Sequence, residues 1–86
     1  MGIDAAVEDV RQRIRTLVAD VLELDESEVA DDADLSESFA ADSLQHLELV
    51  SALEREYGVR FSADDWRDAM TVAGLTKVTL ARLNAA

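Results

Sequence analysis

The stretch Ala40-Ala41-Asp42-Ser43-Leu44, followed by the helical run of residues 45–57, decides the fold that this sequence predicts. A single hydroxyl stands at the predicted start of a helix, with a carboxylate before it and a leucine after it. Between Arg15 and Arg55 the chain contains no Lys or Arg, whereas Asp and Glu occur twelve times. A serine in this setting suits an enzyme with a basic surface, which would find the hydroxyl by charge and modify it.

The composition favours a small all-α fold. A chain of 86 residues has room for one core, so residues 1–86 are expected to form a single domain. Hydrophobic residues make up 49%, but only four residues are aromatic, so the core must consist mostly of Leu, Val and Ala. Such a chain, without proline, favours helices over sheets. The absence of cysteine excludes disulfides, thiolate metal sites and thiol catalysis.

The formal net charge of −11 limits the partners that this chain can bind. It argues against nucleic acids and anionic membranes, whose phosphates would repel the protein, and it favours proteins with basic surfaces. The alternative interpretation is that the charge only provides solubility. No apolar run approaches the length of a membrane span, and the acidic start does not resemble a signal peptide. We therefore expect a cytoplasmic monomer.

The first predicted helix covers residues 4–24, with Asp4 as its cap. Its apolar residues recur every three or four positions and mark one buried face: Val7, Val10, Ile14, Leu17, Val18, Val21 and Leu22. Arg11, Arg13 and Arg15 fall mostly outside that face and are expected to be solvated.

Residues 25–41 predict a long loop, because they are rich in Asp, Glu and Ser and lack apolar periodicity. Three widely spaced side chains are expected to hold this loop on the core: Val29, Leu35 and Phe39. The acidic run of residues 31–34 does not predict a calcium site. An EF-hand loop that starts at Asp32 would need Gly and Glu where Glu37 and Ser43 stand. We expect no metal site.

The second helix is predicted to begin at Asp42 or Ser43 and to end at Tyr57, before Gly58. Four side chains of this helix are predicted to lie on one buried face: Leu49, Val50, Leu53 and Tyr57. The only histidine, His46, lies among them.

Two leucines of the same helix, Leu44 and Leu47, lie outside the buried face. With Glu48 and Ser51 they form an apolar patch with an acidic margin beside Ser43. Such a patch is typical of a docking surface for a protein partner.

The remaining residues predict a short helix and a last long helix. Ser62 caps the short helix, which carries Trp66, and Thr71 caps the last one. The last helix turns these residues inward: Val72, Leu75, Val78, Thr79 and Leu83. Gly74 is expected to weaken it slightly. We interpret Trp66 as a cap over the core in preference to a contact in a pocket.

Ser43 by itself predicts no more than a helix cap, which is a very common role of serine at a helix start. A phosphodiester on its hydroxyl would lie at the positive end of a helix dipole, so the site tolerates a phosphate. His46 follows three residues later and suggests a Ser-His pair. No strand-turn-helix nucleophile elbow surrounds the serine, so hydrolase activity is not expected.

The residues around Ser43 resemble the acyl carrier protein family. That family typically reads Leu-Gly-Ala-Asp-Ser-Leu, and residues 39–44 read Phe-Ala-Ala-Asp-Ser-Leu before an acidic and apolar helix that ends in Tyr57. Residues 21–25 and 71–72 continue the similarity, which therefore covers nearly the whole chain. The resemblance implies a right-turning four-helix bundle, with three main helices, one short helix and a long first loop. Ala40 replaces the usual Gly, which implies that the loop turns differently.

The resemblance also implies roles for individual residues. Ser43 matches the attachment site of a 4'-phosphopantetheine arm from coenzyme A, and Asp42 matches the residue read by the transferase that installs it. The positions of the family's partner-recognition helix are matched by Leu44, Leu47 and Glu48, with Ser51 in the same patch. The positions that face the bundle and the acyl pocket are matched by His46, Val50 and Leu53.

The function implied by this resemblance is that of a discrete carrier, not an enzyme. The thiol of the arm would supply the sulfur that a chain without cysteine lacks, and would hold acyl intermediates as thioesters. Polyketide or other specialised biosynthesis is favoured over fatty-acid synthesis because of Ala40, His46 and Trp66. The expected partners are a phosphopantetheinyl transferase, an acyltransferase or ligase, a ketosynthase and other biosynthetic enzymes with basic docking surfaces. Two alternatives stay open: a peptidyl or aminoacyl carrier protein, and an unmodified acidic interaction module that binds through Leu44 and Leu47.

Overall fold

The computed structural model describes the backbone of residues 3–39 and 42–85, and the side chains of residues 7–37 and 42–84. This part of the chain contains helices only, in the following order: α1 (Ile3–Leu22), η1 (Glu26–Glu28), α2 (Leu35–Phe39), α3 (Ser43–Tyr57), α4 (Ala63–Asp68) and α5 (Val72–Ala85). The prediction of an all-α fold with three main helices is confirmed. No helix among the described residues is both long enough and apolar enough to cross a membrane.

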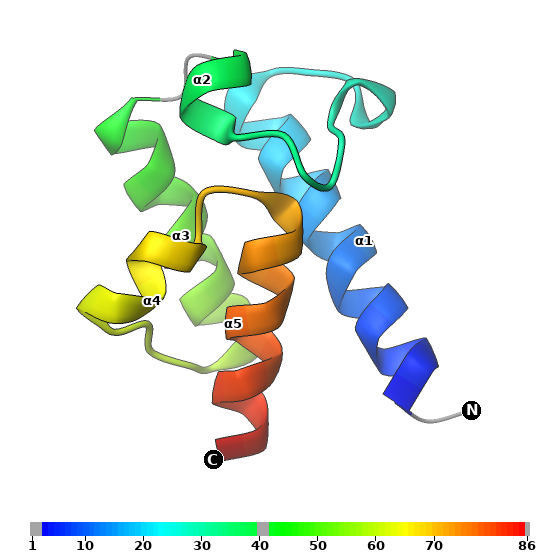
Figure 1. Cartoon of the computed structure of the whole chain (residues 1–86), viewed down its shortest axis with the longest axis vertical. Helices are drawn as coiled ribbons and strands as arrows, with labels where there is room; N and C mark the ends of the chain where they lie inside the picture. The colour runs from blue at the N-terminus through cyan, green and yellow to red at the C-terminus, as the bar shows by residue number, and fades with distance from the viewer. Residues whose placement is uncertain (1–2, 40–41, 86) are drawn as a thin grey trace.

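The three long helices form the bundle (Figure 1). α1 packs along α5 and against α3, and α5 also contacts α3 and the short α4. The chain between α1 and α3 crosses one end of the bundle, where α2 lies near the start of α3, whereas the first turn of α1 and the last turn of α5 lie toward the opposite end (Figure 1). The main core forms where the helices meet: Val10, Ile14, Val18, Ala19, Val29, Leu35, Leu49, Leu53, Ala69, Val72 and Leu75.

The acidic segment between α1 and α3 is held on the core as the sequence predicted, but it contains more helix than the predicted loop. It contains the single 3-10 turn η1 and the short helix α2. The two predicted anchors Val29 and Leu35 are almost fully buried, which confirms their role. The third anchor, Phe39, and the turn at Ala40 lie outside the described side chains and backbone, respectively. The segment is thus an ordered crossing over the end of the bundle.

Backbone hydrogen bonds join this crossing segment to the start of α5. The N–H of Leu35 donates to the carbonyl oxygen of Met70 at 2.8 Å, and the N–H of Ala73 donates to the carbonyl oxygen of Asp31 at 2.9 Å. These bonds connect residues that are far apart in the sequence. They therefore fix the position of α2 relative to the turn between α4 and α5.

The three arginines of α1 are ion-paired. The prediction that they are solvated is wrong for Arg11 and Arg15, whereas the Arg13 side chain stays 45% exposed. Arg11 and Arg15 both donate to the carboxylate of Asp31, and Arg13 pairs with Glu56 of α3. Only 26% of the Arg11 side chain and 24% of the Arg15 side chain stay exposed. Burial opposes ionisation of Asp31, but the hydrogen bonds from Arg15 and Arg11 outweigh it and lower the pKa of its carboxyl group.

The ends of the helices follow the predicted caps with one exception. Gly58 ends α3 in the left-handed conformation, with φ of 64°, and Ser62 caps α4. The hydroxyl of Thr71 accepts a hydrogen bond from the N–H of Gly74 at 2.9 Å, as expected for the cap of α5. The prediction for Asp4 is wrong, because this residue lies inside α1.

Gly74 has a packing role that the sequence did not predict. A Cβ atom at this position would overlap with the backbone oxygen of Asp68, the last residue of α4. The missing side chain therefore allows the first turn of α5 to approach the end of α4 closely. The turn between these helices forms one wall of the site described next.

Candidate functional site

Asp42 and Gln45 form a complete capping box at the start of α3. The Asp42 carboxylate accepts a hydrogen bond from the N–H of Gln45 at 2.8 Å, and the Gln45 side-chain oxygen accepts one from the N–H of Asp42 at 3.1 Å. This reciprocal pair satisfies two backbone donors and fixes the first turn of the helix. Asp42 is therefore the cap, and Ser43 is the first residue of the helix, with an exposed side chain. The alternative interpretation of Ser43 as a helix cap is therefore wrong, and its hydroxyl has no part in the cap.

A hollow of about 300 Å³ lies beside Ser43. It is lined by side chains from α2, from the start of α3, from α4 and from the turn before α5: Ser36, Asp42, Ser43, His46, Trp66 and Met70. We call it the Ser43 hollow. More apolar than polar surface lines it, so it suits a slender and mainly apolar group next to an exposed hydroxyl.

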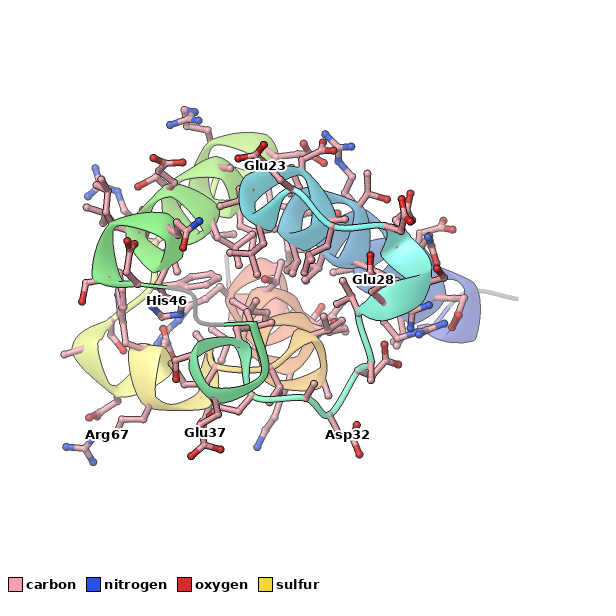
Figure 2. The ribbon with its side chains drawn as sticks, turned by 90° about the horizontal axis from the view of Figure 1, so that it is seen from above. Glu23, Glu28, Asp32, Glu37, His46 and Arg67 are labelled. Carbon is pink, nitrogen blue, oxygen red and sulfur yellow. The ribbon has the colours of Figure 1, made fainter. Side chains whose placement is uncertain are left out.

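His46 holds one wall of the Ser43 hollow. Its Nε2 atom lies 2.8 Å from the carbonyl oxygen of Ala69, to which it donates, and its ring meets Trp66 edge to face with the centroids 4.9 Å apart. Figure 2 shows His46 between the start of α3 and the short α4. This nitrogen serves a structural hydrogen bond, so the contact does not support a Ser-His catalytic pair. The predicted position of His46 at the edge of the core is confirmed.

The residues predicted to face an acyl pocket occupy two different places. His46 lines the Ser43 hollow, whereas Val50 and Leu53 are almost fully buried and are not among its lining residues. Leu53 belongs to the main core. In this structure, therefore, only one member of the predicted set reaches the surface beside Ser43.

Three lining residues of the Ser43 hollow were not predicted to belong to the site. Trp66 was interpreted as a cap over the core, but it lines the hollow and contacts His46. Ser36 comes from α2, whose helical start is fixed by Asp34, since the Asp34 carboxylate accepts from the N–H and the hydroxyl of Ser36 at 2.9 and 2.7 Å. These hydrogen bonds lower the pKa of Asp34. Met70 lies in the turn before α5, and its carbonyl oxygen accepts the hydrogen bond from the N–H of Leu35 in α2.

The outer face of α3 carries the predicted docking patch. Leu44 is 63% exposed and Leu47 is 48% exposed. Among the described residues, these two are the large hydrophobic side chains that are exposed. Glu48 is exposed beside them and Ser51 is half-buried. We call these four residues the α3 outer strip. An exposed pair of leucines next to a carboxylate is suited to contact with an apolar and basic surface.

No cluster of three or more side chains in the described part of the chain has the composition and spacing of a metal site. The acidic run that invited a calcium interpretation is used internally instead. Asp31 binds two arginines, and Asp34 binds the start of α2. Both carboxylates therefore have structural partners.

An all-α bundle that exposes one serine at a capped helix start, next to a small hollow and an apolar strip, has the features of a carrier that presents a group to other proteins. Residues 12–78 match the family described as "PP-binding: Phosphopantetheine attachment site". Because this match spans most of the chain, the protein belongs to this family, the acyl carrier proteins, as the resemblance predicted. It is thus a carrier and not a catalyst, and its cofactor is covalent 4'-phosphopantetheine.

A relative and two solved structures agree with this assignment. Polyketide-8 synthase acyl carrier protein 2 of Streptomyces avermitilis is 41% identical over 73 residues, which cover 85% of this chain and 84% of that protein. The acyl carrier protein of Enterococcus faecalis, 24% identical, covers 88% of this chain and 96% of its own with a TM-score of 0.75. The HMG-ACPI domain of the CurA module of Lyngbya majuscula, 20% identical, covers 92% and 80% with a TM-score of 0.76. At these identities the two structures establish the fold, which is the predicted helical bundle.

Proposed function

We propose that Ser43 carries the 4'-phosphopantetheine arm and that the chain holds acyl intermediates of polyketide biosynthesis as thioesters on it. The observation that carries this proposal is the capping box. Asp42 caps α3 alone, so an exposed hydroxyl stands at the helix start without a structural duty. Membership of the phosphopantetheine family then supplies the chemistry for that hydroxyl. The 41% identity to a polyketide synthase carrier supports the pathway.

The surroundings of Ser43 fit a phosphodiester. The first N–H groups of α3 and the helix dipole favour an anion at this end, although the neighbouring Asp42 carboxylate has the same sign of charge. The Asp42 oxygen that accepts from Gln45 is already oriented by that bond. When attached, the arm supplies the thiol that the chain itself lacks, since the sequence has no cysteine.

The Ser43 hollow is proposed to receive the part of the arm or cargo nearest to the serine. Trp66 and Met70 offer apolar contacts, and Ser36 and His46 offer polar edges. A volume of about 300 Å³ accommodates a short group and not a long chain. We propose that Val50 and Leu53, which are almost fully buried, contact only cargo that enters the core.

The α3 outer strip is proposed as the surface that partner enzymes contact. Leu44 and Leu47 would enter apolar recesses, and Glu48 would meet a basic side chain. The enzymes expected to use it are the phosphopantetheinyl transferase, an acyltransferase or ligase, and a ketosynthase. Asp42, at the N-terminal end of the strip, would be recognised by the transferase.

Intact-mass spectrometry tests the attachment site. Wild-type protein incubated with coenzyme A, magnesium and a promiscuous phosphopantetheinyl transferase should gain the mass of one arm, and Ser43→Ala should gain none. Ser36→Ala is the matched control, because it removes the other serine of the same hollow and should load normally. A mass gain that persists in Ser43→Ala would falsify the assignment.

A further inference from the structure

Half of the basic side chains of this acidic protein are committed to ion pairs. Four of the eight Lys and Arg residues form ion pairs with carboxylates of the described residues: Arg11, Arg13, Arg15 and Arg82. The other four form no ion pair with a described carboxylate: Arg55, Arg60, Arg67 and Lys77. Arg55 and Arg60 line one hollow, and Arg67 and Lys77 line another. The hollow of Arg55 and Arg60 adjoins the α3 outer strip.

The turn at Gly58 places Arg60 beside Arg55. The N–H groups of Gly58 and Val59 both donate to the carbonyl oxygen of Glu54, and the left-handed Gly58 reverses the chain. The segment after the turn therefore returns along the last turn of α3. Arg55 and Arg60, both exposed, line one hollow of about 540 Å³ at this end of the helix.

The carboxylates of the last turn of α3 have partners other than Arg55 and Arg60. Glu54 is held by the backbone, because its Oε2 atom accepts from the N–H of Phe61 at 2.8 Å. Glu56 is paired with Arg13. The guanidinium groups of Arg55 and Arg60, which line the hollow and form no ion pair with a described carboxylate, are therefore available to a partner.

This end of the helix is continuous with the α3 outer strip. Ser51 and Arg55 line both the Arg55/Arg60 hollow and a neighbouring hollow that contains Leu47 and Glu48. The spacing of three and four residues from Leu47 to Arg55 keeps these side chains on one helix face. At 1.5 Å per residue, Arg55 lies roughly 10 Å beyond Glu48 and about 18 Å beyond Ser43. Since the Debye length is about 8 Å at physiological ionic strength, a partner senses the two charges separately.

We propose that Arg55 and Arg60 form a second docking point, which binds carboxylates on the surface of a partner enzyme. That surface has a basic side chain opposite Glu48, apolar recesses for Leu44 and Leu47, and acidic side chains about 10 Å further along the helix. The proposal rests on the proposed function, in which the enzymes that act on the arm contact α3. A uniformly basic partner, which the net charge of −11 alone would favour, is repelled at this end. The two charges of opposite sign therefore fix the direction in which a partner lies along α3 and discriminate among carriers.

Charge reversal at Arg55 and Arg60 tests the docking point. It should slow association with a partner that has acidic side chains at this end, and it should speed association with a uniformly basic partner. Arg55→Glu/Arg60→Glu is compared with Arg67→Glu/Lys77→Glu, which changes the net charge equally on the other hollow. Each protein is first loaded to completion, as checked by intact mass, and its helical content is verified by circular dichroism. Association with a purified ketosynthase from polyketide biosynthesis is then followed by stopped flow at low and physiological salt.

We expect the Arg55/Arg60 reversal to slow association about threefold or more relative to the control pair, with the difference shrinking as salt increases. Arg55→Lys/Arg60→Lys should retain most of the wild-type rate. Equal rates in the two reversed proteins, or faster association of the Arg55/Arg60 reversal, would overturn the proposal. Failure of the wild-type protein to load at Ser43 would instead contradict the proposed function, so the two failures are distinguishable.

Discussion

His46 of α3 is hydrogen-bonded to Ala69, the residue at the end of α4, with 2.8 Å between Nε2 and the carbonyl oxygen. This bond crosses between two helices at the edge of the core. It holds the turn before α5 against the start of α3, and Trp66 meets the same imidazole from α4. The wall of the Ser43 hollow therefore depends on one side chain that makes both contacts.

Replacement of His46 should loosen that wall. His46→Ala removes the hydrogen bond and the edge-to-face contact, and we expect it to lower the free energy of unfolding by about 1–2 kcal/mol. Trp66 is the only tryptophan, so its fluorescence in the folded protein should change as well. Urea unfolding measures both effects. Glu48→Ala, an exposed change on the same helix, is the control, and an equal stability of the two variants would refute the structural role of His46.

Asp31 should make folding sensitive to acid. The arginine hydrogen bonds hold the pKa of its carboxyl group below the ordinary value of 3.8, against the effect of burial. A carboxyl group with a lowered pKa in the folded state contributes stability above its unfolded pKa, and loses it as the pH falls through its folded pKa. Asp31→Asn should thus cost about 1–2 kcal/mol at pH 7, allowing for partial exposure of the pair. The difference from wild type should shrink below pH 4 in urea titrations.

The control for this acid effect is Asp32→Asn, which changes an exposed neighbour that points away from the bundle (Figure 2). It should leave stability at pH 7 nearly unchanged. If both variants lose the same stability, or if the loss in Asp31→Asn does not shrink as the pH falls, the pairs with Arg11 and Arg15 do not act as described.

The two described glycines should respond differently to alanine. Gly58→Ala places a Cβ in open space but keeps a positive φ, so it should cost about 1–2 kcal/mol of conformational strain. Gly74→Ala has an ordinary helical backbone, yet its Cβ would overlap with the oxygen of Asp68 and displace the turn between α4 and α5. We expect a loss of about 1–3 kcal/mol together with altered Trp66 fluorescence, which Gly58→Ala should not show. Thermal unfolding and emission spectra of both variants decide this, and an unchanged Trp66 signal in Gly74→Ala would argue against the close approach.

Leucines on opposite faces of α3 should separate stability from docking. Leu53→Ala truncates a fully buried side chain and should cost about 2–5 kcal/mol. Leu47→Ala truncates a side chain that is 48% exposed and should change stability by less than about 0.5 kcal/mol. Under the proposed function, Leu47→Ala should raise the rate of dissociation from a partner enzyme. Unchanged dissociation would place the contact surface away from Leu47.

Features encoded by neighbouring residues could be predicted from the sequence. The predicted bounds of α3 were correct at both ends, because the residues that set them, Asp42 and Gly58, lie directly next to the helix. The buried and exposed faces of α3 followed from the helical period, which separated Leu53 from Leu44 and Leu47.

Features that depend on distant contacts could not be predicted in this way. α2 is only five residues long and depends on the bond between Leu35 and Met70, so its sequence resembles a loop. The arginines of α1 lie off its apolar face, and their partners, such as Asp31, are brought near by the crossing segment. Trp66 lines the Ser43 hollow because α4 is held against α3, which no periodicity reveals.

The first turn of α1 and the last turn of α5 lie toward one end of the bundle, whereas the start of α3 lies at the other (Figure 1). A fluorescent label, a surface linker or a fused protein joined at either of these turns would therefore sit away from Ser43. The protein immobilised through such a linker would display its serine outward to the solution. This polarity makes the fold suitable for tethered assays in which several enzymes are supplied in succession to the same anchored molecule.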